Sequence, residues 1–389
     1  MAEAPLLDGI TVLDLSSVGP ASRASRMLAD YGARVVKVGP TAKKGAVQIR
    51  PPFHSYGAGR DFERFQVDLK APEGKDAFLR LATRADVLIE SYRPGVTARL
   101  GIGYDDVRKV NERIIYCSTS GYGQDGPYSA WAGHDINYLA VGGYLACSTE
   151  AANGGPPIPG ATVADAAGGG MHAVLAILAA LVRRATTGRG RYLDVAATEG
   201  VLSLMSLSID QFLATGEVAG PRQTLLTGRY ACYDVYRAKD GKWLSVGAIE
   251  PHFWANLCKL LGLEPYAALQ NDDARQDEIR AAFQKVFAER DRDDWVAALA
   301  PRDTCVAPVY SIPELTKDPH LEARRIFMEA EEREHGRFRQ VAPLLAGGVR
   351  ERPLHRVREP EGTDTDRLLR EADLGDADIA RLRAAGAVE

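Results

Sequence analysis

The chain has 389 residues, of which 46% are hydrophobic and 26% charged, and its formal net charge is −4 at pH 7. This length is enough for two domains with cores of their own, and the composition is that of an ordinary globular protein. The slightly acidic balance argues against a nucleic acid or an anionic membrane as a partner, because both carry negative charge themselves.

The amino terminus, MAEAPLLDGITVLDLSS, shows no signal-peptide pattern. The most apolar run, residues 171–182, is too short to span a bilayer and is predicted to be a buried helix. No CxxC pair occurs among the five cysteines, which predicts reduced thiols and neither a disulfide framework nor a zinc site: Cys117, Cys147, Cys232, Cys258 and Cys305. We therefore expect a soluble, cytoplasmic protein.

The first third of the chain alternates strand and helix signals. Strands are predicted at residues 10–17, 34–40, 65–70, 86–92 and 114–123, and helices at residues 21–32 and 72–85. Such βαβ units imply a parallel sheet. After an irregular stretch at 147–165, a helix at 168–184, a strand at 191–197 and a helix at 198–216 complete the pattern of one doubly wound α/β domain.

The pattern changes after about residue 220. Residues 230–250 predict two antiparallel strands joined by a Lys-Asp-Gly turn, and helices are predicted at 251–263, 277–290 and 293–300. We therefore expect a large α/β domain of residues 1–221, to which residues 321–389 return, and a smaller α+β domain of residues 222–320.

Familiar catalytic motifs are missing. The first strand-to-helix turn, LSSVGPASRAS, lacks the G-x-G-x-x-G fingerprint, and the second strand ends in VVKVGP without an acidic residue for a ribose. A nicotinamide enzyme therefore has only the fold class in its favour. The sequence also lacks a G-x-S-x-G elbow, a P-loop and an H-E-x-x-H motif, and we expect no metal.

Three acid–base candidates remain, each near glycine at a strand or loop end: His134 in GHDINY, Asp165 in VADAAGGG and Glu250 in VGAIEPHF. Each also has a structural interpretation. His134 could bond a carbonyl group, while Asp165 and Glu250 could cap the helices that follow them. Asp135 is expected to brace its turn.

Three consecutive glycines follow Asp165. We expect Gly168, Gly169 and Gly170 to leave a helix start bare, where free N–H groups could hold an oxyanion.

Taken together, four segments resemble the α-methylacyl-CoA racemases of the family III CoA-transferase superfamily, also called the CaiB/BaiF type. They are GHDINY (133–138), AD-x-x-GGG (164–170), VGAIEPHF (246–253) and VLIESYRPGVTARLG (87–101). The resemblance implies an interlocked homodimer with its active site between the large domain of one subunit and the small domain of the other.

The resemblance also implies roles for the three acid–base groups. His134 would serve the S side and Asp165 the R side of the α-carbon of an acyl thioester, exchanging base and acid roles with direction. Glu250 would bond the far nitrogen of His134. Backbone N–H groups near a helix start would hold the enolate oxygen. Coenzyme A would be part of the substrate, with no separate cofactor.

A further set of positions would bind coenzyme A by the same resemblance. It comprises Val67, Asp68, Leu69 and Lys70; Ser91, Tyr92 and Arg93; Arg99; and Gly133, Asp135, Ile136, Asn137 and Tyr138 through the backbone of GHDINY. For Lys70, Arg93 and Arg99 the alternative is solvated surface charge. The basic run at 183–191 is interpreted as the positive end of a helix.

The sequence departs from the racemase pattern in two places. Pro40 stands where racemases often have an arginine for CoA phosphate, leaving Lys37, Lys43 or Lys44 as candidates. The segment GATVADAAGGG lacks the Asn-Leu pair and the Phe that line the acyl pocket, so the acyl group is expected to differ.

Two further hypotheses stay open beside the racemase. In a CoA-transferase, Asp165 would be the nucleophile that forms an acyl anhydride and then an aspartyl-CoA thioester. The other is a protein that binds CoA esters without turnover.

Overall fold

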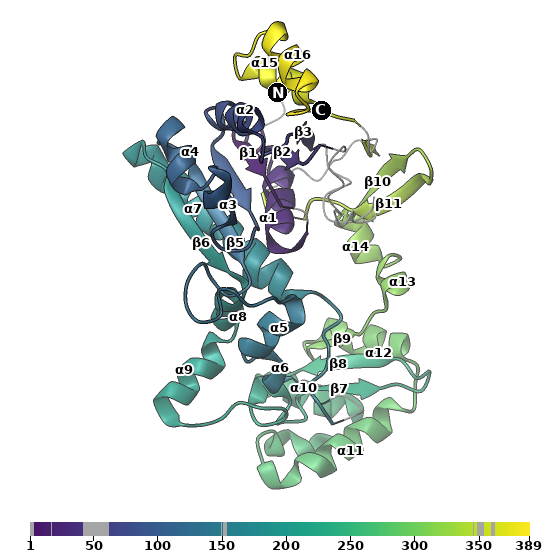
Figure 1. The fold of residues 1–389 in the computed structure, drawn as a ribbon. Helices are drawn as coiled ribbons and strands as arrows, with labels where there is room; N and C mark the ends of the chain where they lie inside the picture. Colours follow the sequence, from purple (N-terminus) through teal and green to yellow (C-terminus); the bar gives the residue numbers. More distant parts are fainter. Residues whose placement is uncertain are drawn as a thin grey trace. The chain divides into compact units, whose positions relative to one another are not determined.

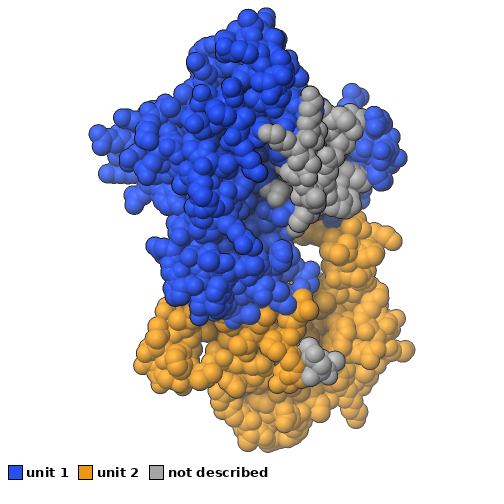
Figure 2. Space-filling view, viewed as in Figure 1, with its two compact units in different colours: residues 1–142, 159–205, 322–389 blue, residues 143–158, 206–321 orange. Residues whose placement is uncertain are grey.

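The computed structural model describes residues 4–16, 18–41, 62–148, 150, 154–344, 346–347, 354–358 and 362–389. Lys43 and Lys44 lie outside these residues. Contacts divide the chain into two compact units, coloured separately in Figure 2. Unit 1 comprises Met1–Gly142, Pro159–Met205 and Glu322–Glu389, and unit 2 comprises Gly143–Ile158 and Ser206–Leu321. The domain boundaries expected at residues 221 and 321 stay a prediction.

Unit 1 contains a six-stranded parallel sheet in the order β3-β2-β1-β4-β5-β6. Its strands are β1 (Thr11–Asp14), β2 (Arg34–Gly39), β3 (Glu63–Gln66), β4 (Val87–Glu90), β5 (Ile115–Ser120) and β6 (Arg191–Ala196). This is the order of a doubly wound sheet, whose direction of winding reverses between β1 and β4. The six predicted strands and the α/β class are thus confirmed.

Helices cover both faces of this sheet (Figure 1). One core contains residues of α1 (Gly19–Asp30) and α7 (His172–Thr187), and the other contains residues of α2 (Pro72–Ala82) and α4 (Tyr104–Val110). Neighbouring strand residues alternate between the two cores, as Val12 and Leu13 do on β1. This alternation follows from the two-residue period of a strand and makes both faces of the sheet apolar.

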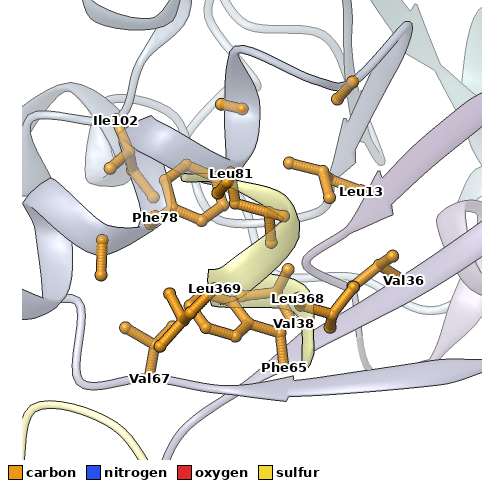
Figure 3. Close-up of a cluster of buried hydrophobic side chains, with 14 of the residues drawn as sticks. Leu13, Val36, Val38, Phe65, Val67, Phe78, Leu81, Ile102, Leu368 and Leu369 are labelled. Atoms are coloured by element: carbon orange, nitrogen blue, oxygen red, sulfur yellow. The ribbon is translucent and has the colours of Figure 1, made fainter. Parts of the chain in front are cut away.

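The end of the chain completes one of the two cores. Leu368 and Leu369 on α15 (Thr365–Glu371) lie among Phe65 and Phe78 of the first hundred residues (Figure 3). The helix α16 (Asp376–Ala384) follows, and the backbone of Val388 pairs with that of Val67 in an antiparallel bridge. The last 25 residues or so therefore pack where the strand β3 ends.

The remaining elements of unit 1 are short. They are α3 (Val96–Leu100), α5 (Asp135–Val141), the π-helix η2 (Ala164–Met171), α8 (Ala197–Leu204) and a second sheet, in the order β11-β10-β12, of β10 (Phe327–Glu332), β11 (Gly336–Val341) and β12 (His355–Arg356).

Unit 2 is built on a three-stranded antiparallel sheet of β7 (Tyr233–Arg237), β8 (Trp243–Gly247) and β9 (Val306–Pro308). The predicted hairpin is confirmed, with Gly241 at a φ of 80° in its turn. Trp254, Phe283 and Phe287 fill the core beneath the sheet. Its α-helices are α6 (Tyr144–Cys147), α9 (Ser206–Thr215), α10 (Pro251–Leu261), α11 (Gln276–Phe287), α12 (Arg292–Leu299), α13 (Ile312–Leu315) and α14 (Pro319–Ala323). The last two residues of α14 are assigned to unit 1. The 3₁₀ helices of unit 2 are η3 (Leu225–Thr227), η4 (Glu264–Leu269), η5 (Asp273–Arg275) and η6 (Ala300–Arg302).

Two helices differ from the prediction. The single helix expected at 198–216 is broken at Met205 into α8 and α9, which fall in different units. The helix expected at 168–184 is longer, because η2 and α7 together run through 24 residues from Ala164 to Thr187.

This long helix is also less buried than expected. Only 39% of its most apolar window is buried, and Leu175 and Val182 are exposed. Length and composition alone would let it cross a membrane, but a single such helix is weak evidence, because core helices satisfy the same criterion.

Candidate active site

His134 stands at the end of a loop, as expected, directly before a short helix. It is the N-terminal cap of α5, and its own backbone N–H donates to Oδ1 of Asn137 at 3.0 Å. The His134 side chain is exposed. The Asn137 side chain thus fixes the backbone of His134, while the imidazole itself remains exposed to solvent.

Tyr138 fixes the same turn from the other side. Its hydroxyl donates to the carbonyl oxygen of Gly133 at 2.5 Å. A Cβ atom on Gly121 or Gly133 would lie 2.2 or 2.7 Å from the Tyr138 ring, so only glycine leaves room for it. Burial, followed by the negative charge of Asp165, raises the pKa of Tyr138 to about 12, so this hydroxyl stays protonated and donates at neutral pH.

Asp135 joins the His134 segment to Asp165. Its Oδ1 accepts the backbone N–H of Asp165 at 2.8 Å, across a separation of 30 residues in the sequence. The Asp135 carboxylate thus braces the Asp165 segment, while the expected bracing of its own turn stays a prediction. This bond brings His134 and Asp165, which sequence analysis paired only by resemblance, into one structural unit.

The Asp165 carboxyl has a shifted pKa. Burial is the largest cause and raises it, and the negative charge of Asp135 raises it further, while Arg23 and His134 act in the opposite direction. A buried carboxylate beside a second carboxylate loses part of its preference for the charged form. Its side chain forms no helix cap, since Asp165 lies inside the first turn of η2.

The three glycines after Asp165 do not form an open helix start, and that expectation is wrong. Gly168, Gly169 and Gly170 are buried within the continuous helix. A Cβ atom on Gly169 would lie 2.5 Å from Pro20 Cβ, and one on Gly200 would lie 1.7 Å from the carbonyl oxygen of Gly168. The glycines therefore allow close packing against α1 and α8, and leave no bare N–H groups for an oxyanion.

Two predicted CoA-binding segments follow strands at the carboxyl edge of the parallel sheet. Val67–Lys70 follow β3, and Ser91–Arg93 follow β4. Ligands of doubly wound sheets bind at this edge. Glu90 fixes the second segment, because its buried Oε2 accepts the N–H of Tyr92 at 2.7 Å.

The predicted positions differ in what their side chains can do. The side chain of Val67 belongs to the core, and Asp68 is buried with its Oδ1 accepting the N–H of Lys70 at 3.1 Å. Leu69 and Tyr92 pack partly on the same core, whereas Ser91 is exposed and Ile136 is 38% exposed.

The cations of these segments are open to solvent. Lys70, Arg93 and Arg99 are exposed, and within the described ranges no carboxylate pairs with any of them. Lys37 is different, because its Nζ lies 2.8 Å from Oδ2 of the fully buried Asp14 and 3.1 Å from Oγ of Ser16. Lys37 therefore neutralises an internal carboxylate, which makes it a poor substitute for the missing phosphate-binding arginine.

Glu250 belongs to unit 2 and is exposed. It is the residue before α10, with Pro251 in the first turn, but its carboxylate makes no capping hydrogen bond. The structural interpretation as a side-chain cap is therefore wrong. Gln270 fixes the backbone just before it by donating to the carbonyl oxygens of Ala248 and Ile249 at 3.1 and 2.6 Å.

Other features lie apart from these residues. A cavity of about 510 Å³ is lined by residues of α7 and the start of β6 with Tyr104, and includes none of the predicted site residues. In the part of the chain that is described, one group could hold a metal ion: Glu332, Glu334 and His335. There Glu332 Oε2 already accepts the backbone N–H groups of Glu334 and His335, and it lies 2.7 Å from Nδ1 of His335.

Arg23 is a site residue that sequence analysis missed. It lies on α1, and its Nη2 donates to Oγ1 of Thr162 at 2.5 Å, across 139 residues of sequence. Its charge acts directly on Asp165. Its segment, GPASRAS, lacks a dinucleotide fingerprint, and no local pattern in it indicates packing against the helix that carries Asp165.

Comparison with known proteins shows the family to which the chain belongs. Residues 7–365 match the model of CoA-transferase family III. The chain is 37% identical to human alpha-methylacyl-CoA racemase over 343 residues, covering 87% of this chain and 86% of the human protein.

A transferase and a solved structure are also similar. Acetyl-CoA:oxalate CoA-transferase of Acetobacter aceti is 28% identical over 338 residues, which cover 83% of this chain and 85% of that enzyme. The crystal structure of a CAIB/BAIF family protein from Brucella suis has the same fold, with a TM-score of 0.78 at 24% identity, over 95% of this chain and all of that one. The chain therefore belongs to CoA-transferase family III and is an enzyme of that superfamily.

Proposed function

We propose that this enzyme interconverts the epimers of 2-methyl-branched acyl-CoA thioesters by 1,1-proton transfer. One group removes the α-proton, the electron pair moves into the thioester carbonyl to give an enolate, and a second group returns a proton to the opposite face. His134 and Asp165 are the two groups. The observation that carries the proposal is the bond from Asp135 to the Asp165 backbone, which holds the His134 and Asp165 segments together.

The state of Asp165 is compatible with proton exchange. A general base and acid works best when its pKa is close to the working pH, and the raised pKa of Asp165 is a shift in that direction. Glu250 is proposed to orient His134, a role that rests on the resemblance to racemases.

Binding of coenzyme A is assigned to the carboxyl edge of the sheet. Lys70, Arg93 and Arg99 would meet its phosphates, and the exposure of these three cations supports this assignment. The acyl-CoA is the substrate, and no separate cofactor is required for an isomerisation without redox change.

A second copy of the chain is the proposed macromolecular partner. In unit 1, Met171 at the end of η2 and Leu175 and Val182 on α7 are exposed to the extent of 49, 66 and 73%. A row of large apolar side chains at helical spacing favours a protein interface. We propose a cytoplasmic homodimer that acts in lipid metabolism without a membrane or nucleic acid as partner.

A CoA-transferase is the second candidate, supported by the similarity to the Acetobacter aceti enzyme. Asp165 would then attack the acyl thioester and form an anhydride with release of CoA thiolate, which attacks the aspartyl carbonyl and frees the acid. The resulting aspartyl-CoA thioester passes CoA to a second acid. The raised pKa of Asp165 does not distinguish the two functions.

The test is α-proton exchange in D₂O with separate (2R)- and (2S)-2-methylacyl-CoA. The wild type should incorporate deuterium with inversion. His134→Ala should exchange only the 2R and Asp165→Ala only the 2S epimer, both without inversion, because one base remains in each.

Transferase activity is measured on the same samples. Movement of CoA to an added free acid, together with an absence of α-deuterium, would refute the racemase and support the transferase. Lys109→Ala, an exposed change on α4, is the control and should behave as the wild type.

A further inference from the structure

Arg23 is bound to the beginning of the segment that carries Asp165. Its Nη2 donates to Oγ1 of Thr162, whose own carbonyl oxygen accepts the N–H of Ala166 at 2.9 Å. A Cβ atom added to Gly170 would lie 3.1 Å from the Cβ of Arg23, so the two residues are close neighbours. The guanidinium of Arg23 is therefore bound just before η2, and its Cβ packs beside Gly170 near the end of η2.

The charged neighbours of Asp165 come from two helices. The elements packed against η2 are α1, α5, α7, α8 and β6. Of these, α1 supplies Arg23, whereas α5 and its cap supply Asp135 and His134. The hydroxyl of Tyr138, also on α5, stays neutral because its pKa is raised to about 12. Arg23 is thus a permanent positive charge at the start of the Asp165 segment.

We infer that Arg23 is a positioning residue of this site, whose guanidinium at the start of the Asp165 segment favours the ionised carboxylate, the form that can accept a substrate proton. The role in proton transfer rests on the proposed function, whereas the effect on ionisation does not.

The need for this charge follows from the surroundings of Asp165. Burial and the charge of Asp135 both favour the protonated carboxyl, and a protonated carboxyl cannot act as a base. The bare N–H groups expected after Asp165 are absent because the glycines are packed. The positive side chain of Arg23 on α1 acts against both effects.

The test compares three variants on α1. Arg23→Gln removes the charge and keeps an amide donor for Thr162, and Arg23→Lys keeps the charge. Arg26→Gln is the matched control one turn further on, where Arg26 donates to the carbonyl oxygen of Val341 at 3.5 Å. Thermal unfolding of each variant shows that it is folded.

The first readout needs no catalysis. Carbodiimide activates protonated carboxyls, so coupling of glycine ethyl ester to Asp165, located by tandem mass spectrometry, measures its protonation against pH. Loss of the Arg23 charge raises the pKa, so the midpoint of labelling in Arg23→Gln should move up by about 1 pH unit. Arg23→Lys and Arg26→Gln should keep the wild-type midpoint.

The second readout is the pH profile of exchange with the 2R epimer. Its acidic limb should move to higher pH in Arg23→Gln and in no other variant, while the KM for the CoA ester stays unchanged. A folded Arg23→Gln protein with the wild-type labelling midpoint would overturn the inference. Displaced labelling without any α-proton exchange in the wild type would keep the effect on Asp165 and refute the proposed racemase.

Discussion

The ionisation of Asp165 depends on individual neighbours contributed by distant parts of the chain. Asp135 and Arg23 act on it with opposite sign, one from α5 and the other from α1. Asp135 has a second effect, because it also accepts the backbone N–H of Asp165. The residue that fixes the position of Asp165 thus also makes it a weaker acid.

Replacing Asp135 by Asn should separate these two effects. The amide oxygen can still accept the Asp165 N–H, but the negative charge is lost, so the pKa of Asp165 should fall. The carboxylate would then stay ionised to lower pH, and the acidic limb of the exchange profile should move to lower pH, opposite to Arg23→Gln. The measurement is the rate of deuterium incorporation into the 2R epimer across pH; a limb displaced upward would contradict the argument.

Individual residues also show how much of the site could be predicted from the sequence. Asp135 was expected to brace its own turn because it sits next to His134 in a turn-forming segment, but its bond to the distant Asp165 backbone could not be predicted from local sequence. Arg23 could not be found, since it meets Asp165 through packing of α1 on η2 across about 140 residues. Lys37 was a reasonable phosphate ligand by position, but its charge is used by Asp14, which local sequence does not show.

Among the elements, η2 shows why glycine-rich segments are misread. Glycine lowers helix propensity, so Gly168–Gly170 were expected to form the bare start of a helix. In the structure the absence of side chains lets the backbone of α8 approach that of η2, and close packing outweighs propensity. All six predicted strands occur, because strand-forming runs bounded by turns depend mainly on local sequence, although β3 (Glu63–Gln66) begins before the range expected for it.

The close approach of η2 and α8 gives a prediction at this scale. Gly200→Ala would place a methyl group 1.7 Å from the carbonyl oxygen of Gly168, so one of the two helices must move. We expect a loss of about 1–3 kcal/mol in the free energy of unfolding, measured by urea titration. Exchange activity should fall as well, because η2 carries Asp165. Glu199→Ala, an exposed neighbour on α8, is the control; equal stability of the two variants would refute the close packing.

The carboxyl-terminal helices α15 and α16 give a second prediction about stability. Leu369 on α15 is fully buried in the core that includes Phe65 and Phe78. Leu369→Ala should lower the free energy of unfolding by about 2–5 kcal/mol, because it removes buried surface and leaves a cavity. Arg381→Ala on α16, whose pair with Asp378 is exposed, should change it by less than about 1 kcal/mol. Similar urea midpoints for the two variants would show that the last helices contribute little to this core.

For the whole molecule, the exposed apolar face of α7 is the feature that one chain leaves unexplained. The sequence predicted that this helix would be buried, and the rest of its own unit does not bury it. If a second copy covers this face, Leu175→Asp should place a charge in the interface and shift the protein toward the monomer. Light scattering after size exclusion measures the mass, and we expect about half the wild-type value at micromolar concentration. Val110→Asp, an exposed apolar position on α4, is the matched control and should keep the wild-type mass. A wild-type mass of one chain, or an unchanged mass in Leu175→Asp, would refute the proposal that a second copy covers α7.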